Sequence, residues 1–188
     1  RQNFKDYKQK KIMIMMNMLA GLKPFKTIKF NGKEYPEFQT NGNAARFIMP
    51  FAKEVCKGKG LDIGCGKEDW ALPGSIPIDI EFADKWDATH LPDYKYDYIF
   101  SSHCLEHLTD WVKVLDYWTT RIKKNGVLFL YLPDYSQEYW RPWNNTKHVN
   151  ILKPEYFRDY LAHHDWKNIN VSGVDLYNSF AVYARKCW

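Results

Sequence analysis

Cysteine pairs with the spacing of a disulfide framework or a zinc site are missing from this sequence. The four cysteines are scattered along 188 residues and no two of them form a CxxC motif: Cys56, Cys65, Cys104 and Cys187. Closely spaced, paired cysteines are typical of small secreted domains, whereas scattered thiols are typical of reduced proteins. We therefore expect a cytoplasmic protein without a CxxC zinc site.

A zinc-protease motif and a membrane span are missing as well. His103 and His107 are four residues apart, but the order His-Cys-Leu-Glu-His differs from the His-Glu-x-x-His of such proteases, so we expect no metal. The apolar stretch 12–20 is interrupted by Asn17 and is far too short to cross a bilayer. It predicts a short amphipathic helix rather than a transmembrane segment.

Positive charge is concentrated near the N-terminus. Residues 1–60 hold 13 Lys and Arg against 4 Asp and Glu, a net charge of +9, whereas residues 61–188 hold 14 against 18, a net charge of −4. We expect residues 1–42 to form a basic arm, in part a helical cap, and residues 43–188 to form one domain. Such an arm suits an anionic partner, nucleic acid included, although no RNA-binding motif accompanies it. A solvated, solubilising face explains the same charge.

Strands that alternate with helices predict an α/β fold. Short apolar segments at 60–63, 75–80, 96–100 and 127–132 have the length of strands, and the last is continuous and apolar, as in the middle of a parallel sheet. Two further strands are expected at 168–172 and 180–185. This order is typical of a doubly wound, mostly parallel sheet.

Three helices are expected between and around these strands. One covers residues 43–56, where Pro50 implies a kink or a later start. A second covers 105–122, because apolar residues recur there at spacings of three and four and Gly126 follows as a stop. A third begins at Pro154 and runs to about residue 161.

Glycine and polar residues follow the expected strands, where sheets of this class bind ligands. Gly64-Cys65-Gly66 comes directly after the first strand, and glycines there let the backbone turn tightly and approach a ligand. Asp79 lies in the last part of the second strand, where a carboxylate can accept hydrogen bonds from both hydroxyls of a ribose. Asp87-Ala88 lies in the next loop, and Ser101-Ser102-His103 follows the third strand.

This ordered set resembles the class I S-adenosylmethionine (SAM)-dependent methyltransferases, nearest to the type 11 group, over about residues 43–186. Leu61-Asp62-Ile63-Gly64-Cys65-Gly66 is similar to their first motif, and the last two strands resemble their antiparallel pair. The resemblance implies a Rossmann-like sheet of the seven-stranded type with SAM as the cofactor. It also implies that the glycine loop holds the methionine portion, Asp79 the ribose and Asp87-Ala88 the adenine edge, with Ser101-Ser102-His103 beneath the sulfonium. The predicted cofactor-binding residues are Asp62, Gly64, Cys65, Gly66, Asp79, Ile80, Asp87, Ala88, Ser101, Ser102 and His103.

The sequence departs from the family pattern in the first loop and the connection after it. Glu68 stands where a third glycine often falls, and only twelve residues, Pro73-Gly74 among them, separate Gly66 from Asp79. The first crossover helix is therefore expected to be short or absent. A nicotinamide dehydrogenase, the alternative on a similar sheet, normally needs GxGxxG followed by a full helix.

A long aromatic and basic loop at 133–150 is expected to form the acceptor pocket together with the arm. Its tryptophans suit stacking on a sugar or base and its basic residues suit a phosphate or carboxylate, although core packing explains the tryptophans equally well. The predicted substrate residues are Tyr139, Trp140, Arg141, Trp143 and Lys147.

The expected reaction is methyl transfer from SAM to an oxygen or nitrogen of a small or saccharide-like acceptor. Candidate bases are His103, Asp134 and His148, because a hydroxyl or protonated amine must lose a proton. Glu106 and His107 are expected to support the site or begin a helix rather than to catalyse. A nucleic-acid-modifying methyltransferase and a non-catalytic, SAM-binding partner subunit are the two alternatives.

Overall fold

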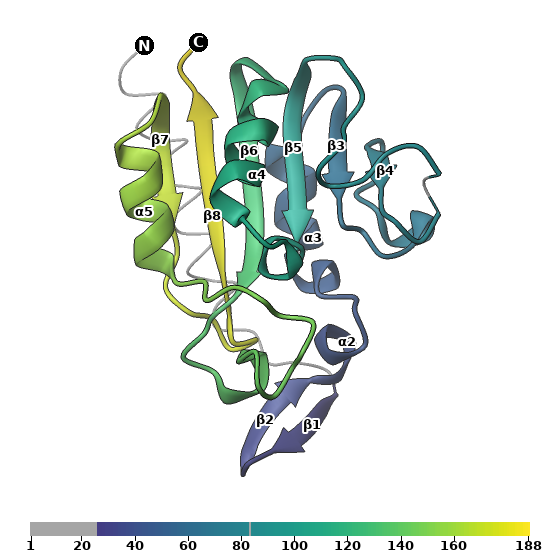
Figure 1. Ribbon diagram of the computed structural model, residues 1–188, viewed down its shortest axis with the longest axis vertical. Coiled ribbons are helices and arrows are strands. Elements are labelled where there is room, and N and C mark those ends of the chain that lie inside the picture. The colour runs from purple at the N-terminus through teal and green to yellow at the C-terminus, as the bar shows by residue number, and fades with distance from the viewer. Residues whose placement is uncertain (1–25, 83) are drawn as a thin grey trace.

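The computed structural model describes residues 26–82 and 84–188, so the helix expected at 12–20 lies outside the described residues. A six-stranded sheet forms the centre, in the order β4-β3-β5-β6-β8-β7 (Figure 1). Its strands are β3 (Gly60–Ile63), β4 (Ile76–Ile78), β5 (Tyr96–Ser102), β6 (Ile122–Pro133), β7 (Trp166–Val171) and β8 (Ser179–Lys186).

The sheet is parallel from β4 to β6, and β8 runs antiparallel to both of its neighbours. The register aligns Leu61 of β3 with Ile99 of β5 and Ile99 with Leu128 of β6. All three side chains are fully buried, as expected for central parallel strands that are covered on both faces. The four parallel strands therefore end at one edge of the sheet.

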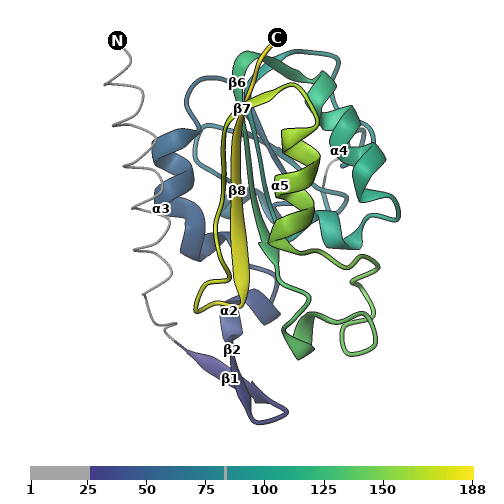
Figure 2. The same ribbon diagram turned by 90° about the vertical axis from the view of Figure 1, so that its left-hand side faces the viewer.

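Helices cover both faces (Figure 2). Helix α3 (Ala45–Val55) lies on one face, and α4 (Trp111–Thr120) and α5 (Pro154–Ala162) lie on the other. Phe51 and Phe129 belong to the apolar core on the α3 side, whereas Trp118 and Phe157 belong to the core on the opposite side. The prediction of a doubly wound, mostly parallel α/β sheet is confirmed.

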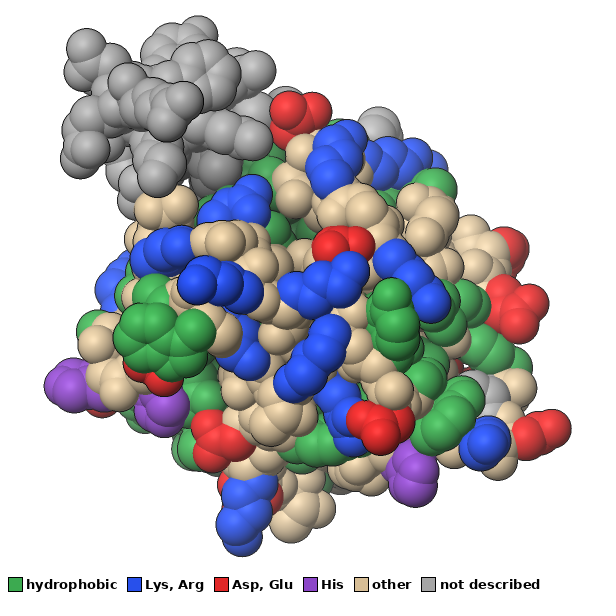
Figure 3. Space-filling view, turned by 90° about the horizontal axis from the view of Figure 1, so that it is seen from above, with side chains coloured by type: hydrophobic (Ala, Val, Ile, Leu, Met, Phe, Trp, Pro, Cys, Tyr) green, Lys and Arg blue, Asp and Glu red, His purple; other side chains and the backbone are tan. Residues whose placement is uncertain are grey.

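The described part of the predicted arm forms a hairpin and a short helix at the carboxyl ends of the parallel strands (Figure 1). Strands β1 (Thr27–Phe30) and β2 (Lys33–Pro36) are joined by Asn31 and Gly32, whose φ values of 48° and 76° suit a type I′ turn. Helix α2 (Glu37–Thr40) follows. Lys and Arg side chains gather at the opposite end of the sheet, seen from above in Figure 3.

The helix expected at 105–122 is wrong at both ends. Leu105–His107 forms a 3₁₀ turn, η2, and α4 begins only after Asp110, whose side chain accepts a hydrogen bond from the Lys113 backbone N–H (3.2 Å). At the other end Ile122 leaves the helix and pairs with Tyr96 at the start of β6. Asp110 is an N-cap residue, so the chain before it takes a different conformation.

The connection between β3 and β4 is as short as predicted. Its helical part is a single 3₁₀ turn, η1 (Glu68–Trp70), and no α-helix lies between β3 and β4, where all residues are described. Helix α3 starts at Ala45 and contains Pro50 in its interior. None of the helices in the described part of the chain is long and apolar enough to span a bilayer.

Candidate active site

The glycine loop after β3 has a backbone that only glycine adopts readily. Gly64 and Gly66 have φ values of +77° and +76°. A Cβ atom on Gly64 would lie 2.5 Å from the Cβ and Sγ atoms of Cys104, and a Cβ atom on Gly66 would lie 3.4 Å from the Trp70 ring. The loop therefore needs glycine at Gly64 for its conformation and for its contact with the chain after β5.

Asp79 joins the end of β4 to this loop. Its Oδ2 accepts a hydrogen bond from the Gly66 backbone N–H (2.7 Å), and its Oδ1 accepts one from the Glu81 N–H (3.1 Å). A carboxylate offers about four lone-pair positions, so Asp79 retains capacity for further donors such as hydroxyl groups. Ile80, the next residue, is 79% exposed.

Asp62 lies inside β3 rather than at the site's surface. It is 1% exposed, and its Oδ2 accepts a hydrogen bond from the Leu72 backbone N–H (2.7 Å), which ties the β3–β4 connection to the strand. Burial and, to a smaller extent, the nearby Asp79 carboxylate raise the pKa of Asp62 to about 7. The structure thus gives Asp62 a supporting position behind the glycine loop.

The end of β5 lies beside the end of β3. Ser101 donates a hydrogen bond to the Ile63 carbonyl oxygen (2.8 Å), and the Ser102 hydroxyl is buried without a hydrogen-bond partner among the described residues. His103 follows with a φ of 51°, and its Nε2 lies 2.9 Å from the Ser179 Oγ. Burial holds the pKa of His103 well below its usual range, so its ring is neutral at neutral pH.

The predicted adenine edge forms a tight turn of its own. The Asp87 Oδ1 accepts a hydrogen bond from the Thr89 backbone N–H (2.6 Å). The Ala88 carbonyl accepts one from the Trp118 Nε1–H (2.7 Å), which fixes the turn against α4. Helix α4 thus sets the position of this loop.

A cleft of about 510 Å³ opens where the N-terminal segment, the end of β5 and the loop after β6 meet. Polar side chains and backbone dominate its lining: Gln39, Thr40, Asn41, Gly42, His103, Glu106, His107, Tyr139, Trp140, Asn144, Asn145, Thr146, Lys147 and His148. The cleft lies next to the glycine loop. Gly42 lines the cleft, and its carbonyl oxygen would be 3.9 Å from a Cβ atom added to Gly66. The volume suits a small-molecule ligand.

Three of the five predicted substrate residues line this cleft: Tyr139, Trp140 and Lys147. Arg141 does not; its guanidinium donates hydrogen bonds to the Tyr135 and Ser136 carbonyl oxygens. Trp143 is 64% exposed and also lies outside the cleft lining.

Two of the three candidate bases also line the cleft, and the third does not. His103 and His148 line the cleft, whereas Asp134 is buried and accepts a hydrogen bond from the Ser136 backbone N–H (2.9 Å) at the end of β6. Burial lowers the pKa of His148 to about 4. Both imidazoles are therefore neutral at neutral pH.

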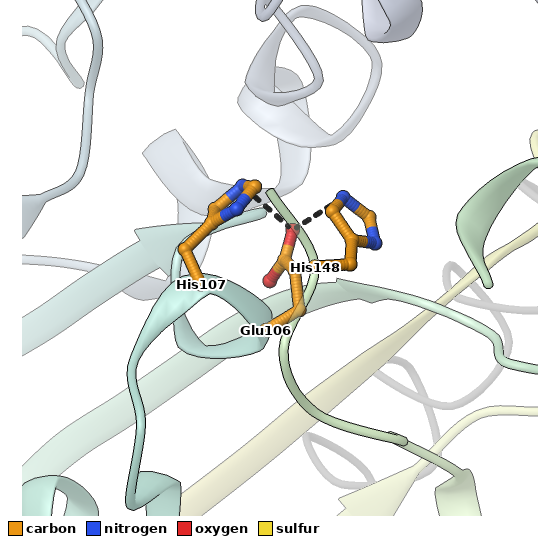
Figure 4. A group of neighbouring side chains, drawn as sticks. All are labelled: Glu106, His107 and His148. Atoms are coloured by element: carbon orange, nitrogen blue, oxygen red, sulfur yellow. Dashed lines mark ion pairs between the residues drawn. The ribbon is translucent and has the colours of Figure 1, made fainter. Parts of the chain in front are cut away.

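Glu106 and its histidine neighbours form a cluster that sequence reasoning missed. Glu106 is 1% exposed, and its Oε1 lies 3.6 Å from the His107 Nε2 and 3.9 Å from the His148 Nε2 (Figure 4). Burial raises the pKa of Glu106 to about 8. The pair Glu106-His107 was the available signal in the sequence, but nothing in the sequence places His148 opposite it.

Comparison with protein families gives one match. The family described as a methyltransferase domain matches residues 37–171, most of the chain. The match includes α2, the glycine loop, the end of β5 and the loop after β6. No curated protein is similar to the chain at a significant level.

Solved structures with the same fold share little sequence with this chain. A SAM-dependent methyltransferase from Archaeoglobus fulgidus is 17% identical, with a TM-score of 0.57 over 80% of this chain and 97% of that one. The N-methyltransferase NodS from Bradyrhizobium japonicum is 15% identical, with a TM-score of 0.52 over 80% and 97%. A putative methyltransferase from Haloferax volcanii, solved in complex with the Trm112 activator, is 12% identical to this chain. The alignment has a TM-score of 0.59 over 80% of this chain and 92% of that one.

Proposed function

Since the chain belongs to the methyltransferase domain family, we propose that it transfers a methyl group from SAM to an oxygen or nitrogen of a small, polar, saccharide-like acceptor. The predicted class I methyltransferase is confirmed by this membership and by the shared fold. One observation carries the proposal: the Asp79 carboxylate and the glycine loop are hydrogen-bonded to each other at the carboxyl ends of β3 and β4.

The residues around the glycine loop fit an adenosyl group. Asp79 is partly exposed and keeps acceptor capacity for ribose hydroxyls. Gly64 and Gly66 carry no side chains, so a ligand can approach the backbone of the loop at these two positions. The buried Ser102 hydroxyl has no hydrogen-bond partner among the described residues and is a further polar group for this ligand. In this proposal the glycine loop holds the methionine portion, and the turn at Asp87-Ala88 lies along the adenine.

The acceptor is placed in the 510 Å³ cleft beside Gly42. SAM, when bound, supplies a methyl group on a positively charged sulfur, which needs little activation. The chain's task is to hold the acceptor atom in line with that methyl group. Tyr139 and Trp140 offer ring faces for a sugar, and the Gln39 Oε1 is buried without a hydrogen-bond partner among the described residues.

A hydroxyl acceptor must also lose its proton. His103 is placed for this, because its ring lines the cleft and is neutral, with Nε2 on the Ser179 hydroxyl. The Ser179 hydroxyl donates to the Tyr177 carbonyl oxygen (3.2 Å) and therefore accepts from the His103 Nε2–H, which leaves Nδ1 to take the proton. His148 is the second candidate, and Asp134 stays a prediction.

Isothermal titration with SAM, its demethylated product SAH and NAD tests the cofactor half of the proposal. Wild type should bind SAM and SAH but not NAD. Asp79→Asn should weaken SAM binding about 10- to 100-fold, the worth of hydrogen bonds to a charged group. The control Asp159→Asn changes an exposed carboxylate on α5 and should bind like wild type. NAD binding without SAM binding, or an unchanged affinity in Asp79→Asn, would overturn the assignment.

The acceptor half is tested by turnover. Radiolabelled SAM and a panel of mono- and disaccharides, amino sugars and polar amines should give labelled product with at least one class. Trp140→Ala should lower kcat/KM for that acceptor while leaving SAM affinity unchanged. Label transfer to RNA alone would replace the saccharide-like acceptor with a nucleic acid. Tight SAM binding without transfer to any acceptor would favour the non-catalytic partner subunit.

A further inference from the structure

The Glu106 side chain is buried, and no group in the described part of the chain forms a hydrogen bond with its carboxyl oxygens. Neither of its oxygens has a hydrogen-bond partner among the described residues, although the side chain is 1% exposed. Three imidazoles surround the Oε1 atom instead, with nitrogen distances of 3.7 Å to His103, 3.6 Å to His107 and 3.9 Å to His148. A buried carboxylate without a partner is costly, so this arrangement requires an explanation.

Direct hydrogen bonds do not explain it. Distances of 3.6 to 3.9 Å are too long for hydrogen bonds between nitrogen and oxygen. The Glu106 Oε1 and the three ring nitrogens therefore face one another without a hydrogen bond between them.

The second ring nitrogen of His107 and of His148 shows which tautomer is present. The His107 Nδ1 lies 2.7 Å from the Lys147 carbonyl oxygen, and the His148 Nδ1 lies 2.9 Å from the Trp140 carbonyl oxygen. A carbonyl only accepts, so each Nδ1 carries the proton and each Nε2 presents a lone pair toward Glu106. Metal-binding histidines are typically oriented in this way, with the far N–H donated to a backbone carbonyl.

The spacing of the donor atoms also suits a shared cation. Two ligand atoms at about 2.1 Å from one tetrahedral metal ion lie roughly 3.4 Å apart. The donor atoms of Glu106, His107 and His148 all lie within 4.8 Å of one another, and the carboxylate–imidazole distances of 3.6 and 3.9 Å approach that separation (Figure 4).

We propose that Glu106, His107 and His148 bind a divalent transition-metal ion such as Zn²⁺ at the wall of the acceptor cleft. Two imidazoles and one carboxylate favour zinc-like or iron-like ions over Mg²⁺, which prefers oxygen ligands. All three residues line the cleft, so the remaining coordination positions face the acceptor space. The sequence pattern hides this site because His148 comes from the loop after β6.

The use of the ion rests on the proposed function, whereas the site itself does not. A cation there would hold an oxygen or nitrogen of the acceptor and keep His148 in place as a ligand. His103 would then be the base in the cleft. Metal binding is measurable without SAM, so a failed methyl-transfer assay leaves the site standing, and a failed metal assay leaves the SAM site standing.

Isothermal titration of chelator-treated protein with Zn²⁺ alone tests the proposal. Wild type should bind one ion per chain, and Zn²⁺ should raise the Tm, since a ligand that binds only the folded state stabilises it. Glu106→Gln and His148→Gln should each weaken binding by more than the roughly 10- to 100-fold typical of losing an outer partner. His163→Gln is the matched control, because the His163 side chain is 74% exposed at the C-terminal end of α5, beside Asp159.

Zinc X-ray absorption provides a readout that does not depend on the variants. The expected first shell contains nitrogen and oxygen at about 2.0–2.1 Å and no sulfur. A sulfur shell would move the ion to the cysteines and overturn the assignment. So would the absence of one-to-one binding in wild type, or an affinity that Glu106→Gln and His163→Gln reduce equally. SAM affinity should be unchanged in Glu106→Gln, which also shows that the variant is folded.

Discussion

Replacing Asp62 with Asn should stabilise the protein at alkaline pH. Burial raises the pKa of Asp62 from its ordinary 3.8 to about 7, and the Leu72 N–H is its hydrogen-bond donor. A pKa unit is worth about 1.4 kcal/mol, so the difference of about three corresponds to roughly 4 kcal/mol. Asn has almost the same shape, and its side-chain oxygen can still accept from the Leu72 N–H.

The sign follows from where the proton binds. Between about pH 4 and pH 7 the folded state holds a proton on Asp62 that the unfolded chain has already released. The contribution of the protonated, uncharged side chain to stability is therefore fully present only below about pH 4. It is lost as the pH rises to about 7, where the folded state carries a buried charge. The wild-type free energy of unfolding should therefore fall relative to Asp62→Asn between pH 4 and pH 7.

Urea unfolding of cofactor-free protein at pH values from 5 to 8.5 measures the effect. Asp62→Asn should exceed wild type by about 2–4 kcal/mol at pH 8 and by much less at pH 5. Asp97→Asn gives the contrast, because the Lys123 ammonium and the Lys59 N–H hold the pKa of Asp97 below its usual range. That variant should lose stability at neutral pH and approach wild type in acid. A difference between Asp62→Asn and wild type that is independent of pH would refute the reasoning.

Two further substitutions test the parts that position the site. Gly64→Ala combines a left-handed backbone with a Cβ placed 2.5 Å from Cys104, so unfolding free energy should fall by about 2–5 kcal/mol. Gly74→Ala, at φ +85° with nothing within 4 Å, should lose only about 1–2 kcal/mol, and equal losses would show that crowding at Gly64 is unimportant. Trp118→Phe removes the donor to the Ala88 carbonyl and should cost about 1–3 kcal/mol in denaturant unfolding. It should also weaken SAM binding, and an unchanged SAM affinity would detach the Asp87-Ala88 turn from the cofactor.

The sheet was predictable because its strands are short, apolar and separated by clear turn residues. The segment 127–132 appears inside β6, and the loop Gly64–Gly66 and Asp79 fall at strand ends as expected. Sequence periodicity failed where a cap interrupts it. Leu105 and the apolar residues of α4 follow one helical spacing in the sequence, but the N-cap Asp110 lies between them and α4 begins only after it. Ile122 fits the same spacing, yet it pairs with Tyr96 as the first residue of β6.

The acceptor side was less predictable because it depends on contacts between segments far apart in the sequence. The aromatic loop does line the cleft with Tyr139 and Trp140, yet Arg141 turns back to its own loop's carbonyl oxygens. Glu106 and His148 meet only because the loop after β6 folds over η2, where the Glu106 carbonyl accepts hydrogen bonds from the Val149 and Asn150 N–H groups. No local pattern encodes that approach.

A crystal structure with SAH bound tests the central claim most directly. The account predicts that the ribose hydroxyls donate to the Asp79 carboxylate and that the amino-acid portion lies along Gly64–Gly66, with the sulfur facing the cleft lined by His103. A nucleoside bound elsewhere on the sheet, or side chains that fill the space in front of Asp79, would contradict it.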